Sequence, residues 1–176
     1  GGDPRSLFLS GHSAGAQLST LTVAAREPLE RHGVDPRVIC GVISVSGAGL
    51  DLADEETYAL GADRAFYRRT FRADPDLADG EWQRRASAVT FLAQGKEGPP
   101  PPWLIFFAGR EHPLFPRQAQ LLKRAVEEAG STAQIIEIPR ASHKRIVGEL
   151  SQPNGGLDAP ILAFIQAHRG CTETPA

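Results

Sequence analysis

The chain has 176 residues, which is enough for one domain with a buried core, and its formal net charge is −2. This balance gives no reason to expect a nucleic acid or an anionic membrane surface as a partner. No apolar run is long enough to span a bilayer, no secretory signal is recognised, and a cytoplasmic location is therefore expected. No Cys and His cluster has metal-ligand spacing, so we expect neither a metal nor another cofactor.

Strand and helix signals alternate along the chain. Strands are predicted from Leu7 to the first glycine turn, at Val38–Val45, at Trp103–Ala108 and at Gln134–Ile138. Helices are predicted over residues 14–26, over residues 119–129 and from an N-cap at Asp158 to Gly170. This alternation indicates an α/β domain in which helices flank a parallel sheet through right-handed crossovers.

The segment from Asp51 to about residue 90 differs in composition from the rest. It is rich in Asp, Glu, Arg and Ala, and its short predicted helices are broken at Gly61, Pro75 and Gly80. We interpret it as a small helical insertion over the sheet. A basic stripe at helical spacing is either a solvated face or a site for a substrate carboxylate; it comprises Arg64, Arg68, Arg69 and Arg72.

The two cysteines are too few for a disulfide framework. Cys40 lies in an apolar run and is expected to be a buried thiol, whereas Cys171 lies in a polar tail. Four consecutive prolines before the third strand, at residues 99–102, are expected to stiffen its entry.

A Gly-x-Ser-x-Gly turn follows the first strand and precedes the first helix. Ser13 at its centre is the predicted nucleophile, with His12 locked inside the turn. Gly11 and Gly15 are expected to leave room where strand and helix backbones pass closely. The backbone N–H of Ala14 is expected to supply one donor of an oxyanion hole. The alternative is a glycine-rich loop with an idle serine.

Three reactive residues each follow a different predicted strand. Ser13 follows the first, Glu111 the third and His143 the fourth, and this order matches that of a nucleophile, acid and base on such a sheet. Histidine can take the serine proton and return it to the leaving group, while a carboxylate fixes the imidazole tautomer. His112 competes with His143 as the candidate base. Two residues compete with Glu111 as the candidate acid, but Glu137 is expected to lie within a strand and Asp158 at a helix cap.

The segment Leu9–Ala16 resembles the nucleophile elbow of α/β-hydrolase esterases. More narrowly, residues 111–118, Glu-His-Pro-Leu-Phe-Pro-Arg-Gln, resemble the acid loop of the kynurenine formamidase-like (arylformamidase-like) branch. Trp82 with residues 85–87, and Ser142-His143 with Ile146, resemble two further segments of that branch. The resemblance runs from about residue 2 to residue 168. It implies an α/β-hydrolase-type sheet and a Ser13, His143 and Glu111 triad that cleaves a small carboxylic ester or activated amide.

The sequence departs from this family in two ways. The family usually has Asp where Glu111 stands. Its sheet has eight strands, of which this chain matches strands 5–8 only, so an upstream motif that donates to the oxyanion is absent. We therefore expect residues 1–176 to form a single, N-terminally incomplete domain, with the upstream half on another chain or missing. Without that half, the first strand presents a bare apolar edge.

Two other functions remain open. The order of the catalytic residues also fits a peptidase of the prolyl-oligopeptidase type, although the acid loop favours the esterase. The missing oxyanion donor favours a catalytically silent module used for binding or assembly. Neither the acyl group, the leaving group nor a homo-oligomeric state follows from the sequence.

Overall fold

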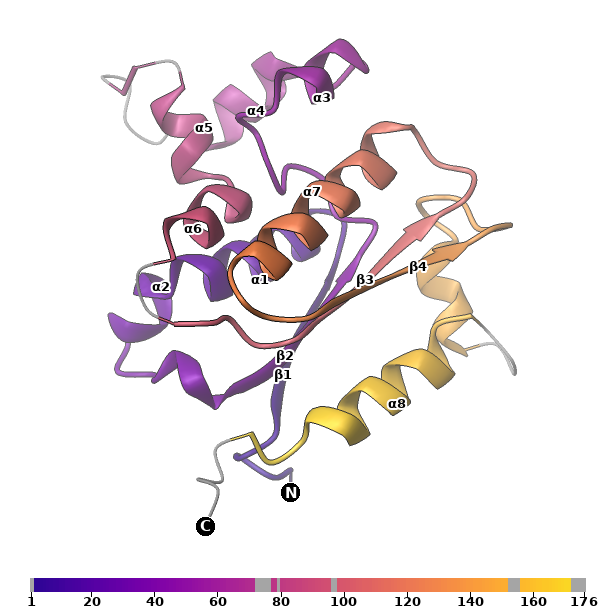
Figure 1. The fold of residues 1–176 in the computed structure, drawn as a ribbon. Helices are drawn as coiled ribbons and strands as arrows, with labels where there is room; N and C mark the ends of the chain where they lie inside the picture. Colours follow the sequence, from indigo (N-terminus) through magenta and orange to yellow (C-terminus); the bar gives the residue numbers. More distant parts are fainter. Residues whose placement is uncertain (1, 72–76, 79, 96–97, 152–155, 172–176) are drawn as a thin grey trace.

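Four parallel strands, in the order β1-β2-β3-β4, form the centre of the computed structural model (Figure 1). The structure describes residues 2–71, 77–78, 80–95, 98–151 and 156–171. The strands are β1 (Leu7–His12), β2 (Ile39–Val45), β3 (Trp103–Ala108) and β4 (Ala133–Ile138). All four predicted strands are confirmed, as is the parallel sheet. Because the strands are parallel, their carboxyl ends meet at one edge, where ligand chemistry gathers in such sheets.

Helices cover both faces of the sheet, so the fold has three layers. The longer helices are α1 (Ala14–Ala25), α7 (Leu114–Glu128) and α8 (Asp158–His168). On one face, Val42 and Ile105 pack with residues of α1, α7 and the shorter α6 (Ala88–Gln94). On the other face, Ile43 and Phe106 pack with Phe164 of α8. Figure 1 shows α8 below the sheet, with α1, α6 and α7 above it. Alternate residues of the central strands thus face two separate cores, which explains their continuous apolar runs.

Among its described residues, the predicted insertion contains three short helices, which are α3 (Glu55–Ala59), α4 (Arg64–Phe71) and α5 (Glu81–Arg85). They have a small core of their own around Leu52 and Trp82, both almost fully buried. The next helix, α6, packs in the main layer, so the separate helical segment ends before it. We call residues 51–87 the cap segment. Pro75 and Arg72 lie outside the described residues.

The edge strand β1 exposes apolar surface. Leu7 is 42% exposed, and Leu18 of α1 and Leu162 of α8 are 64% and 58% exposed. In the described structure, no strand pairs with the outer edge of β1. Among the same residues, no helix is long and apolar enough to cross a membrane. The remaining short elements are α2 (Glu27–Glu30), η1 (Pro36–Val38) and η2 (Ile146–Ser151).

Cys40 and Cys171 form a disulfide, so the prediction of a buried free thiol at Cys40 was wrong. Cys40 is the second residue of β2, and α8 returns across the sheet so that Cys171, just beyond it, lies beside Cys40. Disulfides persist mainly in oxidising compartments, so this bond runs against the expected cytoplasmic location.

The predicted N-cap of the last helix was wrong by one position. Asp158 is the first residue of α8, and Leu157 occupies the cap position without a side-chain hydrogen bond. In the first turn, the carboxylate of Asp158 still lies near the positive end of the helix dipole.

Candidate active site

The turn between β1 and α1 holds Ser13 in a strained conformation. Its φ of 56° and ψ of −116° lie outside the regions that residues with a side chain favour. The Ser13 N–H donates to the Val45 carbonyl of the neighbouring strand at 3.0 Å, which fixes the turn to the sheet. Such strain is typical of functional sites and costs about 1–3 kcal/mol, which the surrounding structure must supply.

The two glycines of this turn have different roles. A Cβ on Gly11 would lie 2.1 Å from the Gly15 carbonyl oxygen, so strand and helix backbones do meet there as predicted. A Cβ on Gly15 would meet nothing within 4 Å, so the expectation that Gly15 also leaves necessary room was wrong. The close approach needs a missing side chain on Gly11 alone, because the contact is with the backbone of Gly15.

Ser13, His143 and Glu111 form a chain of hydrogen bonds. His143 Nε2 lies 2.9 Å from Ser13 Oγ, and His143 Nδ1 lies 3.0 Å from Glu111 Oε2. An ionised carboxylate can only accept, so Nδ1 carries the proton and Nε2 accepts from the serine hydroxyl. The Glu111 side chain is 1% exposed and that of His143 is 29% exposed, so the acid is buried beneath an accessible base.

Ser46 is a member of this site that the sequence reasoning missed. It directly follows β2, is fully buried, and has a positive φ of 46°. Its hydroxyl donates to Glu111 Oε1 at 3.2 Å, and the backbone N–H of Ala108 donates to the same oxygen at 2.8 Å. Glu111 is therefore held at both oxygens. The available signal was the position of Ser46 at the carboxyl end of a strand, which is where the other three residues also lie.

The acid loop is tied to the cap segment by polar contacts. Arg117 Nε and Nη2 each donate to one oxygen of Asp54 at 2.6 Å. Gln118, fully buried, accepts from the Asp51 N–H and donates to the Asp51 carbonyl and to Thr57 Oγ1. Arg and Gln of the recognised acid-loop pattern thus dock the cap segment onto α7.

The charges in this contact shift two acid groups in opposite directions. The Arg117 guanidinium lowers the pKa of Asp54 to about 2, with help from two hydrogen bonds of Thr57. Burial raises the pKa of Asp51, and the neighbouring Asp54 charge raises it further. The two carboxyls therefore respond differently to acid, although they lie three residues apart.

The competing candidates lie elsewhere. His112 Nδ1 accepts from the Leu114 N–H at 3.3 Å, and its ring lies beside Gly61 of the cap segment, not between Ser13 and the acid. Glu137 is an exposed residue of β4. Arg64 of the predicted basic stripe pairs with Glu55 at 2.5 Å and covers the Tyr58 ring at 3.7 Å. For Arg64, these contacts favour a structural role.

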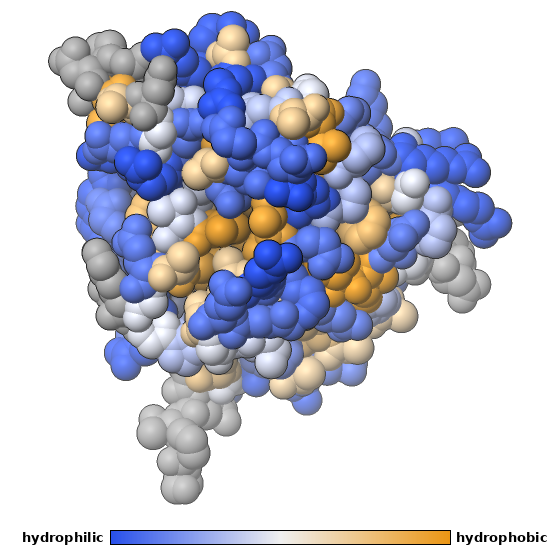
Figure 2. Space-filling view, turned by 45° about the horizontal axis from the view of Figure 1, so that its top comes forward, coloured by the Kyte–Doolittle hydropathy of each residue, from blue (hydrophilic) through white to orange (hydrophobic). Residues whose placement is uncertain are grey.

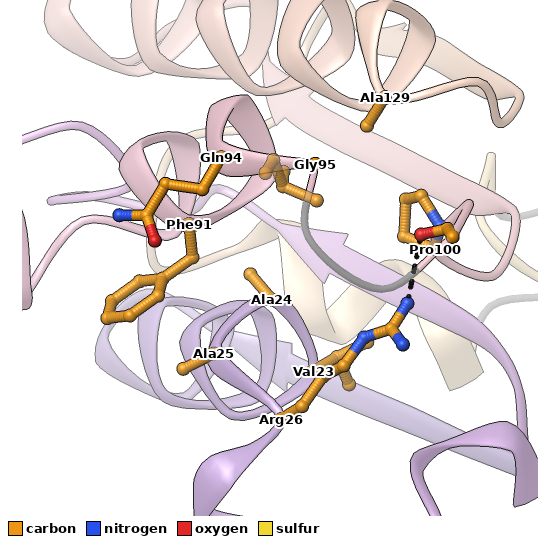
Figure 3. Close-up of a pocket in the computed structure, with 11 residues that line it drawn as sticks. Val23, Ala24, Ala25, Arg26, Phe91, Gln94, Gly95, Pro100 and Ala129 are labelled. Atoms are coloured by element: carbon orange, nitrogen blue, oxygen red, sulfur yellow. Dashed lines mark hydrogen bonds between the residues drawn. The ribbon is translucent and has the colours of Figure 1, made fainter.

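A hollow of about 170 Å³ lies away from these residues, between α1, α6 and the proline-rich loop (Figure 3). It is lined by Val23 and Ala24 at the carboxyl end of α1, whereas Ser13 precedes the other end of this helix. A 12-residue helix is about 18 Å long, so the hollow cannot hold a molecule that reacts with Ser13. The Arg26 guanidinium reaches the Gly98 carbonyl across it at 3.1 Å.

The predicted oxyanion donor is the backbone N–H of Ala14. Ala14 begins α1 directly after Ser13, so this N–H has no partner inside the helix. In the part of the chain that the structure describes, no group of His, Cys, Asp and Glu could hold a metal ion.

No family model matches the sequence, and no curated protein matches it either. Several solved structures are similar to this chain. A truncated carbohydrate esterase from gut microbiota has a TM-score of 0.72 and 16% identity, and the match covers 97% of this chain and 61% of that one. Esterase B from Lactobacillus rhamnosis has a TM-score of 0.66 and 18% identity over 94% of this chain and 53% of that one.

Pyrococcus horikoshii acylaminoacyl peptidase has a TM-score of 0.67 and 14% identity over 99% of this chain. The chain has the α/β-hydrolase fold. It spans 26% of the peptidase and 53–61% of the two esterases, so it corresponds to part of each of these three proteins.

Proposed function

We propose that this α/β-hydrolase chain supplies the catalytic residues of a serine hydrolase that cleaves a carboxylic ester or an activated amide. The observation that carries this proposal is the hydrogen-bonded chain from Ser13 through His143 to Glu111. Its members come from three separate loops at one edge of the sheet, and a structural role alone does not require a strained, accessible serine at their meeting point.

In the first step, Ser13 Oγ attacks the substrate carbonyl while His143 Nε2 takes its proton. Negative charge develops on the carbonyl oxygen, and the Ala14 N–H stabilises it. The tetrahedral species collapses as His143 returns the proton to the leaving alcohol or amine, which leaves an acyl group on Ser13. Glu111 stabilises the transient imidazolium and fixes its tautomer.

In the second step, water takes the place of the leaving group. His143 removes a proton from the water, and the hydroxide attacks the acyl carbon. Ser13 then recovers its proton and the carboxylic acid is released. No other co-reactant is needed.

Within hydrolases, we favour an enzyme of the arylformamidase-like branch. Three of the residues that carry this resemblance make specific contacts: Arg117 and Gln118 hold the cap segment, and Phe115 contacts the ring of His143. Figure 2 turns the upper part of Figure 1 toward the viewer and shows apolar surface across the middle of this face, bordered by polar side chains.

The second candidate is a peptidase, which the likeness to acylaminoacyl peptidase over 99% of this chain favours. We further propose that the second oxyanion donor comes from protein outside this sheet. The exposed apolar side chain of Leu7 on the edge strand β1 supports this arrangement. Without that donor the rate would be lower by about a hundred- to a thousandfold, and a silent binding module remains the third candidate.

A fluorophosphonate probe tests the hydrolase proposal. Labelling of the wild type but not of Ser13→Ala supports it, whereas equal labelling of both rejects it. A failure to label any form, including a polypeptide extended by an upstream half, would favour the silent module. Chromogenic p-nitrophenyl esters, N-formyl aromatic amines and N-acylated peptides then separate an esterase, a formamidase and a peptidase.

A further inference from the structure

We propose that His12 and Phe115 are positioning residues that together brace His143, one through its main chain and the other through its ring. The inference rests on the hydrolase function proposed above. Neither side chain touches Ser13 Oγ or Glu111 in a hydrogen bond, so both act through the histidine. We call this pair of contacts the brace.

His12 holds the histidine loop to the nucleophile turn. It is the last residue of β1 and precedes Ser13. Its Nε2 atom lies 2.8 Å from the backbone carbonyl oxygen of His143. A carbonyl can only accept, so Nε2 of His12 donates and Nδ1 carries no proton in the neutral ring. This bond joins the end of β1 to the loop of His143, 131 residues further along the chain, and fixes the distance between the nucleophile and its base.

Phe115 holds the ring. It lies in the first turn of α7, and its ring centroid is 4.4 Å from that of His143 with 37° between the planes. The His12 ring is also close to His143, at 4.8 Å and 38°. Since Glu111 and Phe115 lie four residues apart, the loop that supplies the acid also supplies the ring contact. The imidazole is therefore restrained by aromatic contacts in addition to its two hydrogen bonds.

The reaction needs this restraint because His143 loses one partner during each cycle. Once Ser13 is acylated, its Oγ no longer offers a proton to Nε2. The bond to Glu111 then remains, and a single bond permits the ring to turn about it. Contact with Phe115 limits that rotation while water enters. The face of a phenyl ring also attracts a cation, so Phe115 favours the imidazolium that forms in both steps.

Matched variants separate the two halves of the brace. His12→Phe keeps a ring but removes the donor, whereas His12→Gln restores a donor. Phe115→Leu removes the ring, whereas Phe115→Tyr keeps it. We expect His12→Phe and Phe115→Leu to lower kcat about tenfold with little change in KM, because misplaced catalytic groups cost rate, not ground-state binding. The two conservative variants should recover most of the rate.

Two controls lie far from the site. His32 is an exposed residue after α2, and Phe91 lines the distant hollow of Figure 3. His32→Phe and Phe91→Leu should leave kcat unchanged. A fall in kcat in these controls that matches the brace variants would show a general effect of the substitutions and would overturn the inference.

A second measurement does not depend on turnover. In protein with ¹⁵N-labelled histidine, the Nδ1 proton of His143 should give a downfield resonance that Glu111→Gln abolishes. We expect His12→Phe and Phe115→Leu to broaden this resonance through faster exchange with water. If kcat and the resonance are both unchanged in these variants, the brace does not exist. If the resonance responds as expected but wild type and Ser13→Ala are equally inactive, the brace stands and the proposed function fails.

Discussion

The contact between Asp54 and Arg117 allows the cap segment to be weakened without altering the proposed catalytic residues. Asp54 also caps α3, since it accepts from the Thr57 N–H and from Thr57 Oγ1. Asparagine caps helices about as well as aspartate, so Asp54→Asn removes the charge and leaves an acceptor for Thr57. The variant therefore isolates the pairing with Arg117.

The size of the effect follows from the pKa shift. The pKa of Asp54 falls from 3.8 to about 2, and at 1.36 kcal/mol per unit this corresponds to about 2 kcal/mol. The Asp54 side chain is 14% exposed, but that of Arg117 is 35% exposed, so solvent screens part of this energy. We expect Asp54→Asn to lower the free energy of unfolding by about 1–2 kcal/mol at pH 7.

The pH dependence of the effect has a definite sign. Between about pH 4 and pH 2, the unfolded chain binds a proton at Asp54 that the folded chain does not. The stabilisation is therefore complete above the unfolded pKa of 3.8 and is lost as the pH falls toward 2. Removing the Asp54 charge also lowers the raised pKa of Asp51, because the Asp54 charge is one cause of that raised pKa. The effect of this change on the stability of the cap segment is smaller than the loss of the Arg117 pairing.

Urea unfolding of both proteins at several pH values between 2.5 and 7 measures this difference. The difference in unfolding free energy between wild type and Asp54→Asn should be largest at pH 7 and should decrease to near zero as the pH approaches 2. Asp35→Asn is the matched control, because Asp35 also caps a short helix and pairs with an arginine, but on the exposed surface. It should change stability little. A gap that is constant with pH, or equal in the two variants, would refute the reasoning.

Three further predictions concern the elbow, the acid and the disulfide. Gly11→Ala should prevent folding to the native state, whereas Gly15→Ala should keep or raise the melting temperature. Thermal unfolding of both variants measures this difference. Equal melting temperatures in the two variants would show that the close backbone contact at Gly11 is unimportant. Ser46→Ala should lower kcat about fivefold, the cost of one hydrogen bond of about 1 kcal/mol, without raising KM in steady-state ester hydrolysis; an unchanged kcat would mean that the Ala108 N–H alone positions Glu111. Cys40→Ser should lower the free energy of unfolding, measured in urea, by about 3–5 kcal/mol. A thiol assay of the denatured but unreduced wild type should find no free thiol. Two free thiols per chain would exclude the disulfide.

Local signals account for the parts of the fold that could be predicted. Continuous apolar runs mark β2 and β3 because both faces of each strand are buried, and their observed ends agree with the predicted ends within one residue. The strand, glycine turn and helix around Ser13 are adjacent in sequence, so the elbow was visible without knowledge of distant contacts. The meeting of Ser13, Glu111 and His143 then follows from parallel strand order alone.

Features that depend on distant packing could not be predicted. The pairing of Cys40 with Cys171 depends on how α8 returns across the sheet, over a sequence separation of 131. Gln118 belongs to the acid-loop pattern, but that pattern did not show that its side chain is fully buried and holds the cap segment. Ser46 carries no motif, and its role exists only because the acid loop lies next to the end of β2.

Glu111 stands where the resembled family usually has aspartate, and its surroundings explain how the longer side chain is accommodated. Ser46 and the Ala108 N–H hold Oε1, which leaves Oε2 to reach His143. The loop that begins with Ser46 continues directly into the cap segment at Asp51, and that segment is docked by Gln118 on the helix that follows Glu111. The orientation of the acid is thus fixed by the same two chain segments that position the cap. A change in cap sequence that alters substrate preference would therefore also act on the acid, and sequences with glutamate at this position are expected to retain a donor equivalent to Ser46.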